Sequence, residues 1–310
     1  MAYQLRQGES VRKGLRRVLR RQLTAATEAL GGDRLSDRSV HQARKHIKKA
    51  RAVLRLVERA TDTREARHCL RHAGRLLSRL RDAAALTESA EQLCSSGSQA
   101  LSPKACLALR NRLQQRRMSA RGSVERHHAI EHARTVLERV RDSVDRWRWK
   151  AVGTRDISRA TRRIYKRARR ALAAAEGADA ATRFHEWRKR IKLLWYAVRL
   201  QARTPASHRQ AAALARMGRW LGDDHNLDVL ESTVGRNPSL AHSRERISML
   251  VRGRQAQLRR MALKTGAAFF TPTAKAFGRS LREAREKPTA RLRPRQRRSL
   301  EARTAATVAA

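Results

Sequence analysis

Apolar residues recur every three or four positions along most of the chain, and this spacing predicts α-helices. Only six prolines and fifteen glycines occur in 310 residues, which is too few for the many turns of an all-β protein. We therefore predict an all-α fold. The helices of the first half are expected near 9–30, 39–59, 64–93 and 104–149, and those of the second half near 155–175, 182–202, 207–234 and 239–263.

The sequence of one predicted helix occurs twice in the chain. Residues 40–57 read VHQARKHIKKARAVLRLV, and residues 184–201 read FHEWRKRIKLLWYAVRLQ. At an offset of 144 the two segments share these pairs: His41/His185, Arg44/Arg188, Lys45/Lys189, Ile47/Ile191, Lys48/Lys192, Arg55/Arg199 and Leu56/Leu200. The same offset aligns residues 74–86 with residues 218–230. The chain is therefore interpreted as an internal duplication whose two copies are expected to pack about a pseudo-twofold axis.

Each copy of this helix has an apolar stripe at steps of three and four residues, which is expected to face the core. The stripe consists of Ala43, Ile47, Ala50, Leu54 and Val57 in the first copy, and of Trp187, Ile191, Leu194, Val198 and Gln201 in the second.

A basic stripe runs beside the apolar one. It consists of His41, Arg44, Lys48, Arg51 and Arg55 in the first copy, and of His185, Arg188, Lys192, Trp195 and Arg199 in the second. Like charges at this spacing repel one another, and residues 40–57 contain no acid that would relieve the repulsion. A solvated charged face is the plain interpretation of such a stripe. Because both copies keep the histidine and most of the bases, an anion-binding surface is favoured.

The composition strengthens this interpretation. The chain has 72 Lys and Arg residues against 27 Asp and Glu residues, a formal net charge of +45. Charge of one sign at this density destabilises a compact fold, so it indicates a polyanionic partner. Nucleic acid, an anionic membrane surface and an inorganic polyanion are the candidates, while a merely solubilising surface is the alternative.

The cysteines and the N-terminus bear on the compartment. Three cysteines without a CxxC pair argue against a disulfide framework and for a reducing compartment. No apolar run of about 18 residues predicts a membrane-spanning helix, so no membrane insertion is expected. The N-terminus lacks the apolar region of a secretion signal. A cytoplasmic location is therefore expected.

The motif helices carry a resemblance to a known family. The pattern V-H-x-x-R-K-x-x-K at 40–48 and its second copy resemble the CHAD family (conserved histidine α-helical domain). The stretch LGDDHNLDVL at 221–230 and the opening YQLRQGESVRKGLRRVL are also similar to that family, so the resemblance covers roughly residues 3–262. It implies two tandem four-helix bundles, here 1–152 and 153–263, with a basic groove or pore between them.

The resemblance also implies a function: binding of inorganic polyphosphate at polyphosphate granules, with neither catalysis nor a cofactor. The implied contacts are His41, Arg44, Lys48, Arg51, Arg55, His185, Arg188, Lys192 and Arg199, and, from the first helix of each half, Arg16, Arg17, Arg20, Arg162, Arg163 and Lys166. Cations around His41 and His185 should keep these rings neutral, and a bound polyanion should raise their pKa. We therefore predict that affinity rises as the pH falls through about 6.5.

The two copies depart from each other in ways that matter for binding. Trp195 stands where the first copy has Arg51, so the halves cannot contact a ligand identically. The first copy keeps only Asp82 where the second has His225, Asn226 and Asp228. An ion pair that orients the motif bases is one possible role for acids there. Residues 264–310 have little apolar periodicity, and we expect a short helix and a basic, largely disordered tail.

The same residues allow competing functions. Nucleic-acid binding is the main alternative, because a basic stripe cannot distinguish the phosphates of DNA or RNA from free polyphosphate. Residues 128–132 match H-x-x-E-H, a metalloprotease-type pattern, but no third ligand can be assigned. No GxxxxGK[ST] loop and no nucleophile triad is found, so no metal site or enzyme activity is predicted. The oligomeric state is left open.

Overall fold

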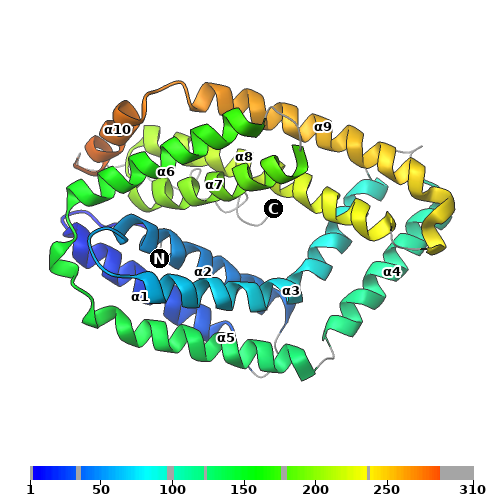
Figure 1. Ribbon diagram of the computed structural model, residues 1–310, viewed down its shortest axis with the longest axis horizontal. Helices are drawn as coiled ribbons and strands as arrows, with labels where there is room; N and C mark the ends of the chain where they lie inside the picture. The colour runs from blue at the N-terminus through cyan, green and yellow to red at the C-terminus, as the bar shows by residue number, and fades with distance from the viewer. Residues whose placement is uncertain are drawn as a thin grey trace, which may run out of the picture.

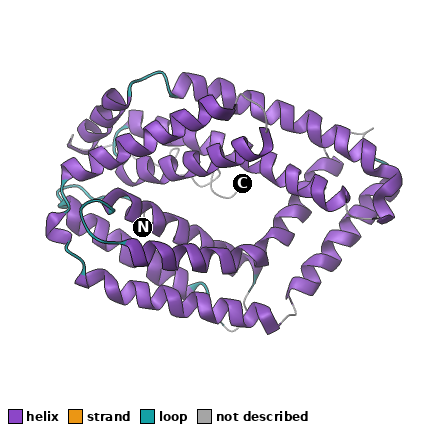
Figure 2. Cartoon of the chain, in the orientation of Figure 1, coloured by secondary structure: helices purple, strands orange, loops and turns teal. Residues whose placement is uncertain are grey.

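A computed structural model describes residues 3–32, 36–95, 101–121, 124–175, 180–235 and 238–286, and all regular structure in these ranges is helical (Figure 2). The fold is all-α, as predicted. The helices are α1 (Val11–Glu28), α2 (Asp37–Val57), α3 (Arg64–Ser95), α4 (Pro103–Arg121), α5 (Val124–Ser143), α6 (Thr154–Ala175), α7 (Ala180–Gln201), α8 (Pro205–Gly235), α9 (Arg244–Phe269) and α10 (Ala274–Glu286). Three short 3₁₀ helices connect them: η1 (Val144–Arg146), η2 (Trp149–Ala151) and η3 (Pro238–Ser243).

The two halves of the chain lie side by side (Figure 1). In the first half α2 packs against α1 and α3, and α5 packs against α1 and α3. In the second half α7 packs against α6 and α8, and α8 packs against α9. The halves meet where α3 contacts α8 and where α2 contacts α6 and α7. The motif helices α2 and α7 are therefore neighbours at the junction of the two halves.

The apolar stripes lie in the core, as their spacing predicts. All five residues of each stripe are buried, from Ala43 to Val57 in α2 and from Trp187 to Gln201 in α7. The main core runs continuously through both halves, and a smaller core joins the far ends of α3, α4, α8 and α9. Burial of the apolar stripe turns the neighbouring basic face of each motif helix away from the core. The basic stripe lies about one residue, or 100°, further round the helix.

One predicted helix is wrong. The segment 104–149 is not a single helix, since α4 and α5 are separate and run in different directions (Figure 1). Their junction at 122–123 lies outside the described residues, and the sequence there is Gly-Ser, a pair that favours turns and helix ends. α5 then ends at Ser143, and η1 and η2 lead into the second half.

Helical structure also continues past residue 263. α9 runs on to Phe269, and Gly266 in its last turn allows Trp187 to lie against the helix: a Cβ atom at Gly266 would be 2.8 Å from the indole ring. α10 then folds back onto α6, where Phe277 stacks on Tyr165 with ring centroids 4.3 Å apart. The expected short helix is present. The rest of the predicted tail, 287–310, lies outside the described residues.

The cysteines correct a second expectation. Cys94, near the end of α3, and Cys106, in the first turn of α4, form a disulfide. The count of three cysteines and the lack of a CxxC pair argued against such a bond. The pairing arises because the chain reverses direction between α3 and α4 and brings residues 12 positions apart into contact, which the spacing alone does not reveal. Cys69 is free.

Within the described ranges, no helix combines the length and the apolar character that a membrane crossing requires.

Candidate functional site

The N-terminal segment fastens α2 to α7. The Leu5 amide donates to the carbonyl of Leu200 at 3.0 Å, and the Tyr3 hydroxyl donates to the carbonyl of Lys49 at 3.1 Å. The Tyr3 ring also lies edge-on to Tyr196, with centroids 6.0 Å apart. Since these contacts span both motif helices, the bases of α2 and α7 are held near one another.

Three half-buried bases lie along this junction: Lys49 from α2, and Lys192 and Arg199 from α7. Burial, together with the charges of Arg199 and Lys45, lowers the pKa of Lys49 to about 8. Burial likewise lowers the pKa of Lys192 to about 8, with Arg188 adding to the effect. The pKa of Arg199 is also lowered by burial. No carboxylate of the described residues forms an ion pair with these three bases. They are partly buried cations without an ion-pair partner, although Asp223 lies near enough to Lys192 to oppose the fall in its pKa.

Trp195 organises the second copy. The Lys192 ammonium lies 5.3 Å from the centroid of the Trp195 ring, and the Arg199 guanidinium lies 5.5 Å from it. Such cation–π contacts orient the cations without neutralising them. Trp195 also packs on the main core. Trp195 therefore positions Lys192 and Arg199 in the second copy, whereas the first copy has a further base, Arg51, at the matching position.

The first copy holds its bases differently. The guanidinium of Arg44 donates to Ser78 Oγ of α3 at 2.8 Å, and Arg55 pairs with Glu58 at 2.8 Å. Lys48 and Arg51 are exposed, and Arg51 lies near Arg71 and Arg75 of α3 as well as Arg55. This stripe thus follows α3, whereas the bases that approach α7 are Lys45 and Lys49.

The two motif histidines occupy the starts of the basic stripes, and both are half-buried. The His185 ring lies 4.2 Å from that of His225 on α8, measured between centroids. Burial lowers the pKa of both His185 and His225, with help from nearby cations, and the pKa of His225 falls to about 4. The Nδ1 atom of His185 is buried and has no hydrogen-bond partner among the described residues.

Acids of α8 lie beside the second basic stripe. Asp224 forms an ion pair with Arg259 of α9 at 2.6 Å, so it orients a base outside the motif. Burial raises the pKa of Asp223, while the nearby Arg254, Lys192 and Arg188 oppose the rise. The side chain of Asp82 in the first copy lies outside the described part of the structure.

The predicted bases of the first helix in each half do not form one set. Arg16 and Arg20 pair with Asp145 at 2.6 and 2.5 Å, and Arg17 pairs with Glu9 at 2.6 Å. These three arginines are therefore paired within the protein, although Arg16 and Arg20 share one carboxylate. The other three lie on α6: Arg163 is near Arg59 and Glu58, Lys166 is exposed, and Arg162 contacts α10.

Sequence reasoning missed several residues at the junction. Lys45 was visible as an identity with Lys189, but Lys49 gave no signal because Leu193 stands at its position in the second copy. Tyr3 and Tyr196 become relevant only because the N-terminal segment lies between α2 and α7.

The histidine pairs that suggest a metal pattern do not converge with a third ligand. His132 lies beside His72, with ring centroids 5.1 Å apart. No three His, Cys, Asp or Glu side chains gather into a metal-binding group anywhere in the described ranges.

The class of protein is a helical domain with an internal duplication. Its two motif helices, α2 and α7, contact each other and carry bases near that contact. The chain belongs to the CHAD family, since the model of the CHAD domain matches residues 13–235. The CHAD domain from the plant Ricinus communis has a similar fold, with a TM-score of 0.52, 16% identity, and coverage of 94% of this chain and 98% of that one. PptA from Streptomyces chartreusis is similar with a TM-score of 0.59, 18% identity, and coverage of 84% and 100%. At these identities the likeness concerns the fold alone. No curated protein matches the chain significantly.

Proposed function

We propose that this CHAD protein binds inorganic polyphosphate, as a granule-associated binding module without catalytic activity. The observation that carries the proposal is the cluster of Lys49, Lys192 and Arg199. These bases are partly buried, and burial lowers the pKa of each of them; Arg199 adds to this effect at Lys49, and Arg188 and Lys45 add to it at Lys192. No acid of the described residues forms an ion pair with the three bases. An arrangement that destabilises the free protein is explained if a polyanion supplies the missing negative charge.

Two unsatisfied buried polar atoms support the same conclusion. Arg199 Nη1, a donor, is buried and lacks a hydrogen-bond partner among the described residues, as does His185 Nδ1, which donates only when it carries a proton. Leaving buried polar groups unsatisfied costs free energy, so such groups indicate a ligand that accepts hydrogen bonds. We therefore place the polymer along α7 between His185 and Arg199, with Lys45 and Lys49 of α2 closing the other side of the proposed groove.

The aromatic residues favour polyphosphate over nucleic acid. All twelve Trp, Tyr and Phe residues lie in the described part of the chain, and none of them is exposed. Proteins that bind single-stranded DNA or RNA stack bases on accessible aromatic rings, which this surface does not offer. A polymer of bare phosphates requires only closely spaced cations and donors.

A charge-matched pair of variants tests the proposal. Lys49→Glu/Lys192→Glu changes the proposed site, and Lys104→Glu/Lys264→Glu changes two exposed lysines on α4 and α9 by the same net charge. Titration with long-chain polyphosphate should show a loss of at least about 30-fold for the first variant, equivalent to about 2 kcal/mol. The control should lose less than about threefold at 0.15 M salt, because exposed charges are screened.

The alternative partner is tested in the same experiment by competition. Double-stranded and single-stranded DNA should displace long polyphosphate only at a large excess of phosphate groups. Equal losses in the two variants, or displacement by DNA at equal phosphate concentration, would show a non-specific polyanion surface and contradict the proposal.

A further inference from the structure

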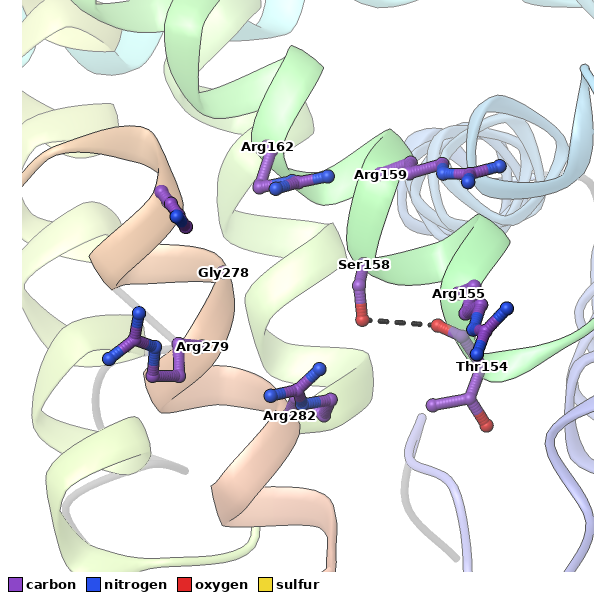
Figure 3. A pocket seen from close by; sticks show the side chains of 9 residues that line it. Thr154, Arg155, Ser158, Arg159, Arg162, Gly278, Arg279 and Arg282 are labelled. Carbon is purple, nitrogen blue, oxygen red and sulfur yellow. Dashed lines mark hydrogen bonds between the residues drawn. The ribbon is translucent and has the colours of Figure 1, made fainter.

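A second cationic site lies away from the junction of α2 and α7, in a cleft between α6 and α10 (Figure 3). The cleft has a volume of about 320 Å³. Six bases line it, three from each helix: Arg155, Arg159 and Arg162 of α6, and Lys275, Arg279 and Arg282 of α10. The spacing of three and four residues puts each set of three on one helix face.

The positive charge of this cleft is not balanced by acids. Within the described residues, none of the six bases forms an ion pair with a carboxylate. The nearest acid of α6, Asp156, accepts a hydrogen bond from the Gly153 amide at 2.9 Å and so caps the start of the helix. The other lining groups are Thr154, Ser158 and Gly278. Two helices thus present like charges to each other across a shared space.

Aromatic packing and hydrogen bonds hold α10 against this repulsion. Phe277 stacks on Tyr165, whose hydroxyl donates to the Pro272 carbonyl at 2.7 Å. Buried Arg285 donates to Gln201 Oε1 and to Ser158 Oγ, each at 3.3 Å. α10 is therefore docked by aromatic packing and by hydrogen bonds from Arg285 to uncharged groups, while its other bases face α6.

Gly278 of α10 lies against Arg162 of α6. A Cβ atom there would lie 2.6 Å from Cγ of Arg162, so the glycine lets the Arg162 side chain cross between the helices. This brings a base of α6 into the same space as Arg279 and Arg282 of α10 (Figure 3). The family match ends at residue 235, so the α10 half of the cleft belongs to the part of the chain that the match does not cover.

We infer that the α6–α10 cleft binds a compact anion carrying several phosphate groups, independently of the proposed groove at α2 and α7. The volume is near the lower end for small-molecule sites, about 300 Å³, which suits a short oligophosphate or a small phosphorylated compound. The bases suit phosphate as hydrogen-bond donors, and the lining has no aromatic ring to stack on a nucleobase. The bases of α6 and α10 repel one another in the free protein, and a bound anion attracts both sets. It should therefore stabilise the packing of α10 on α6.

Hydrogen–deuterium exchange with tripolyphosphate tests this inference. Saturating tripolyphosphate should slow amide exchange in 274–286 of the full chain by about tenfold, because a bridging ligand opposes local opening of α10. Arg279→Gln/Arg282→Gln should abolish this protection at the same tripolyphosphate concentration. Any protection that remains should require at least about tenfold more tripolyphosphate. Both residues are exposed, so the ligand-free variant should melt as the unmodified protein does.

The matched control is Arg110→Gln/Arg112→Gln, which removes two exposed arginines from α4 and should leave the protection of α10 intact. The Lys49→Gln/Lys192→Gln variant should also keep it, and this separates the inference from the proposed function. Protection by both tripolyphosphate and long polyphosphate in that variant would identify a chain end as ligand, and protection by tripolyphosphate alone would identify a free compact anion. Unchanged exchange in 274–286 of the unmodified protein, or equal loss in the α4 control, would overturn the inference.

Discussion

The two motif helices begin from the same sequence pattern but hold their cations in different ways. In α2, Arg44 is bonded to Ser78, Arg55 is paired with Glu58, and Lys48 and Arg51 are exposed. In α7, Lys192 and Arg199 are half-buried around Trp195 and have no paired acid among the described residues. Electrostatic attraction is stronger where water is excluded. The second copy should therefore contribute most of the affinity, and the first copy should contribute a screened, weaker attraction.

The largest expected difference is between equivalent lysines of the two copies. Lys192→Glu should weaken polyphosphate binding at least about 30-fold at 0.15 M salt, because it reverses a partly buried charge. Lys48→Glu, at the matched position of α2, should weaken it about threefold to fivefold, because its charge is exposed. Binding curves for both variants at several salt concentrations measure this. Equal losses would show that the two copies bind alike.

The next effect concerns the stability of the ligand-free protein. Lys192→Met keeps a long side chain against Trp195 but removes a cation that burial disfavours. The free energy of unfolding should rise by about 1–2 kcal/mol at pH 7, while polyphosphate affinity falls. Denaturant unfolding with and without ligand measures both. A destabilised variant would mean that the ammonium is satisfied within the protein.

The pH dependence is expected to come mainly from the second copy. His225 has a pKa of about 4 in the folded protein, below the value near 6.5 of an unfolded chain. The unfolded state then binds more protons, so the ligand-free protein should lose stability as the pH falls from about 6.5 toward 4. His46 on α2, bonded to Gln22 and with a pKa of about 4, adds to this loss.

Polyphosphate should act in the opposite direction. A polyanion beside His185 and His225 raises their pKa, so binding takes up protons and affinity should rise about fivefold to tenfold between pH 7 and 5. His185→Gln/His225→Gln should flatten this rise, whereas His208→Gln on α8 serves as the control for a half-buried histidine elsewhere. Binding isotherms across this range measure the effect. A rise that survives the double substitution would assign it to other groups.

The smallest expected effect on binding comes from substitutions at two aligned glycines, Gly74 of α3 and Gly218 of α8. A Cβ atom at Gly218 would lie 3.1 Å from Cε of Lys192, whereas one at Gly74 would meet only Ile47 at 3.8 Å. Gly74→Ala should raise stability by about 0.5–1 kcal/mol through helix propensity and leave binding unchanged. Gly218→Ala should displace Lys192 and weaken binding about twofold to threefold. Binding titrations and thermal melts of the two variants test this, and equal affinities would mean that Lys192 adapts freely.

Some features of the site follow from local patterns in the amino-acid sequence. The apolar stripes were correctly placed in the core, because helical periodicity is a local property of the sequence. The match of His185 with His41 also singled out His185. The buried Nδ1 atom of this histidine lacks a hydrogen-bond partner among the described residues. The prediction of a single helix at 104–149 was wrong, since α4 ends at Arg121 and α5 begins at Val124. The sequence between them is Gly-Ser, a pair that the helical periodicity on either side obscured.

Other features depended on contacts between distant segments. The disulfide between Cys94 and Cys106 follows from the reversal of the chain, and the burial of Lys49 follows from the passage of Tyr3 between the motif helices. The ion pairs of Arg16 and Arg20 with Asp145 join residues more than a hundred positions apart, so no local pattern could show that these two bases share an acid within the protein.

The sequence by itself determined the helical class, the duplicated motif and the excess of positive charge, because period, identity and composition do not depend on packing. Only the tertiary structure decided which cations lose their water and which meet an acid. Burial and Coulomb interactions depend on what the fold places within a few ångströms of each charge. That is why one copy of the motif holds Arg44 and Arg55 by bonds to Ser78 and Glu58 and exposes Lys48 and Arg51, while the other copy half-buries Lys192 and Arg199 around Trp195. It is also why α10 forms a cationic cleft with α6.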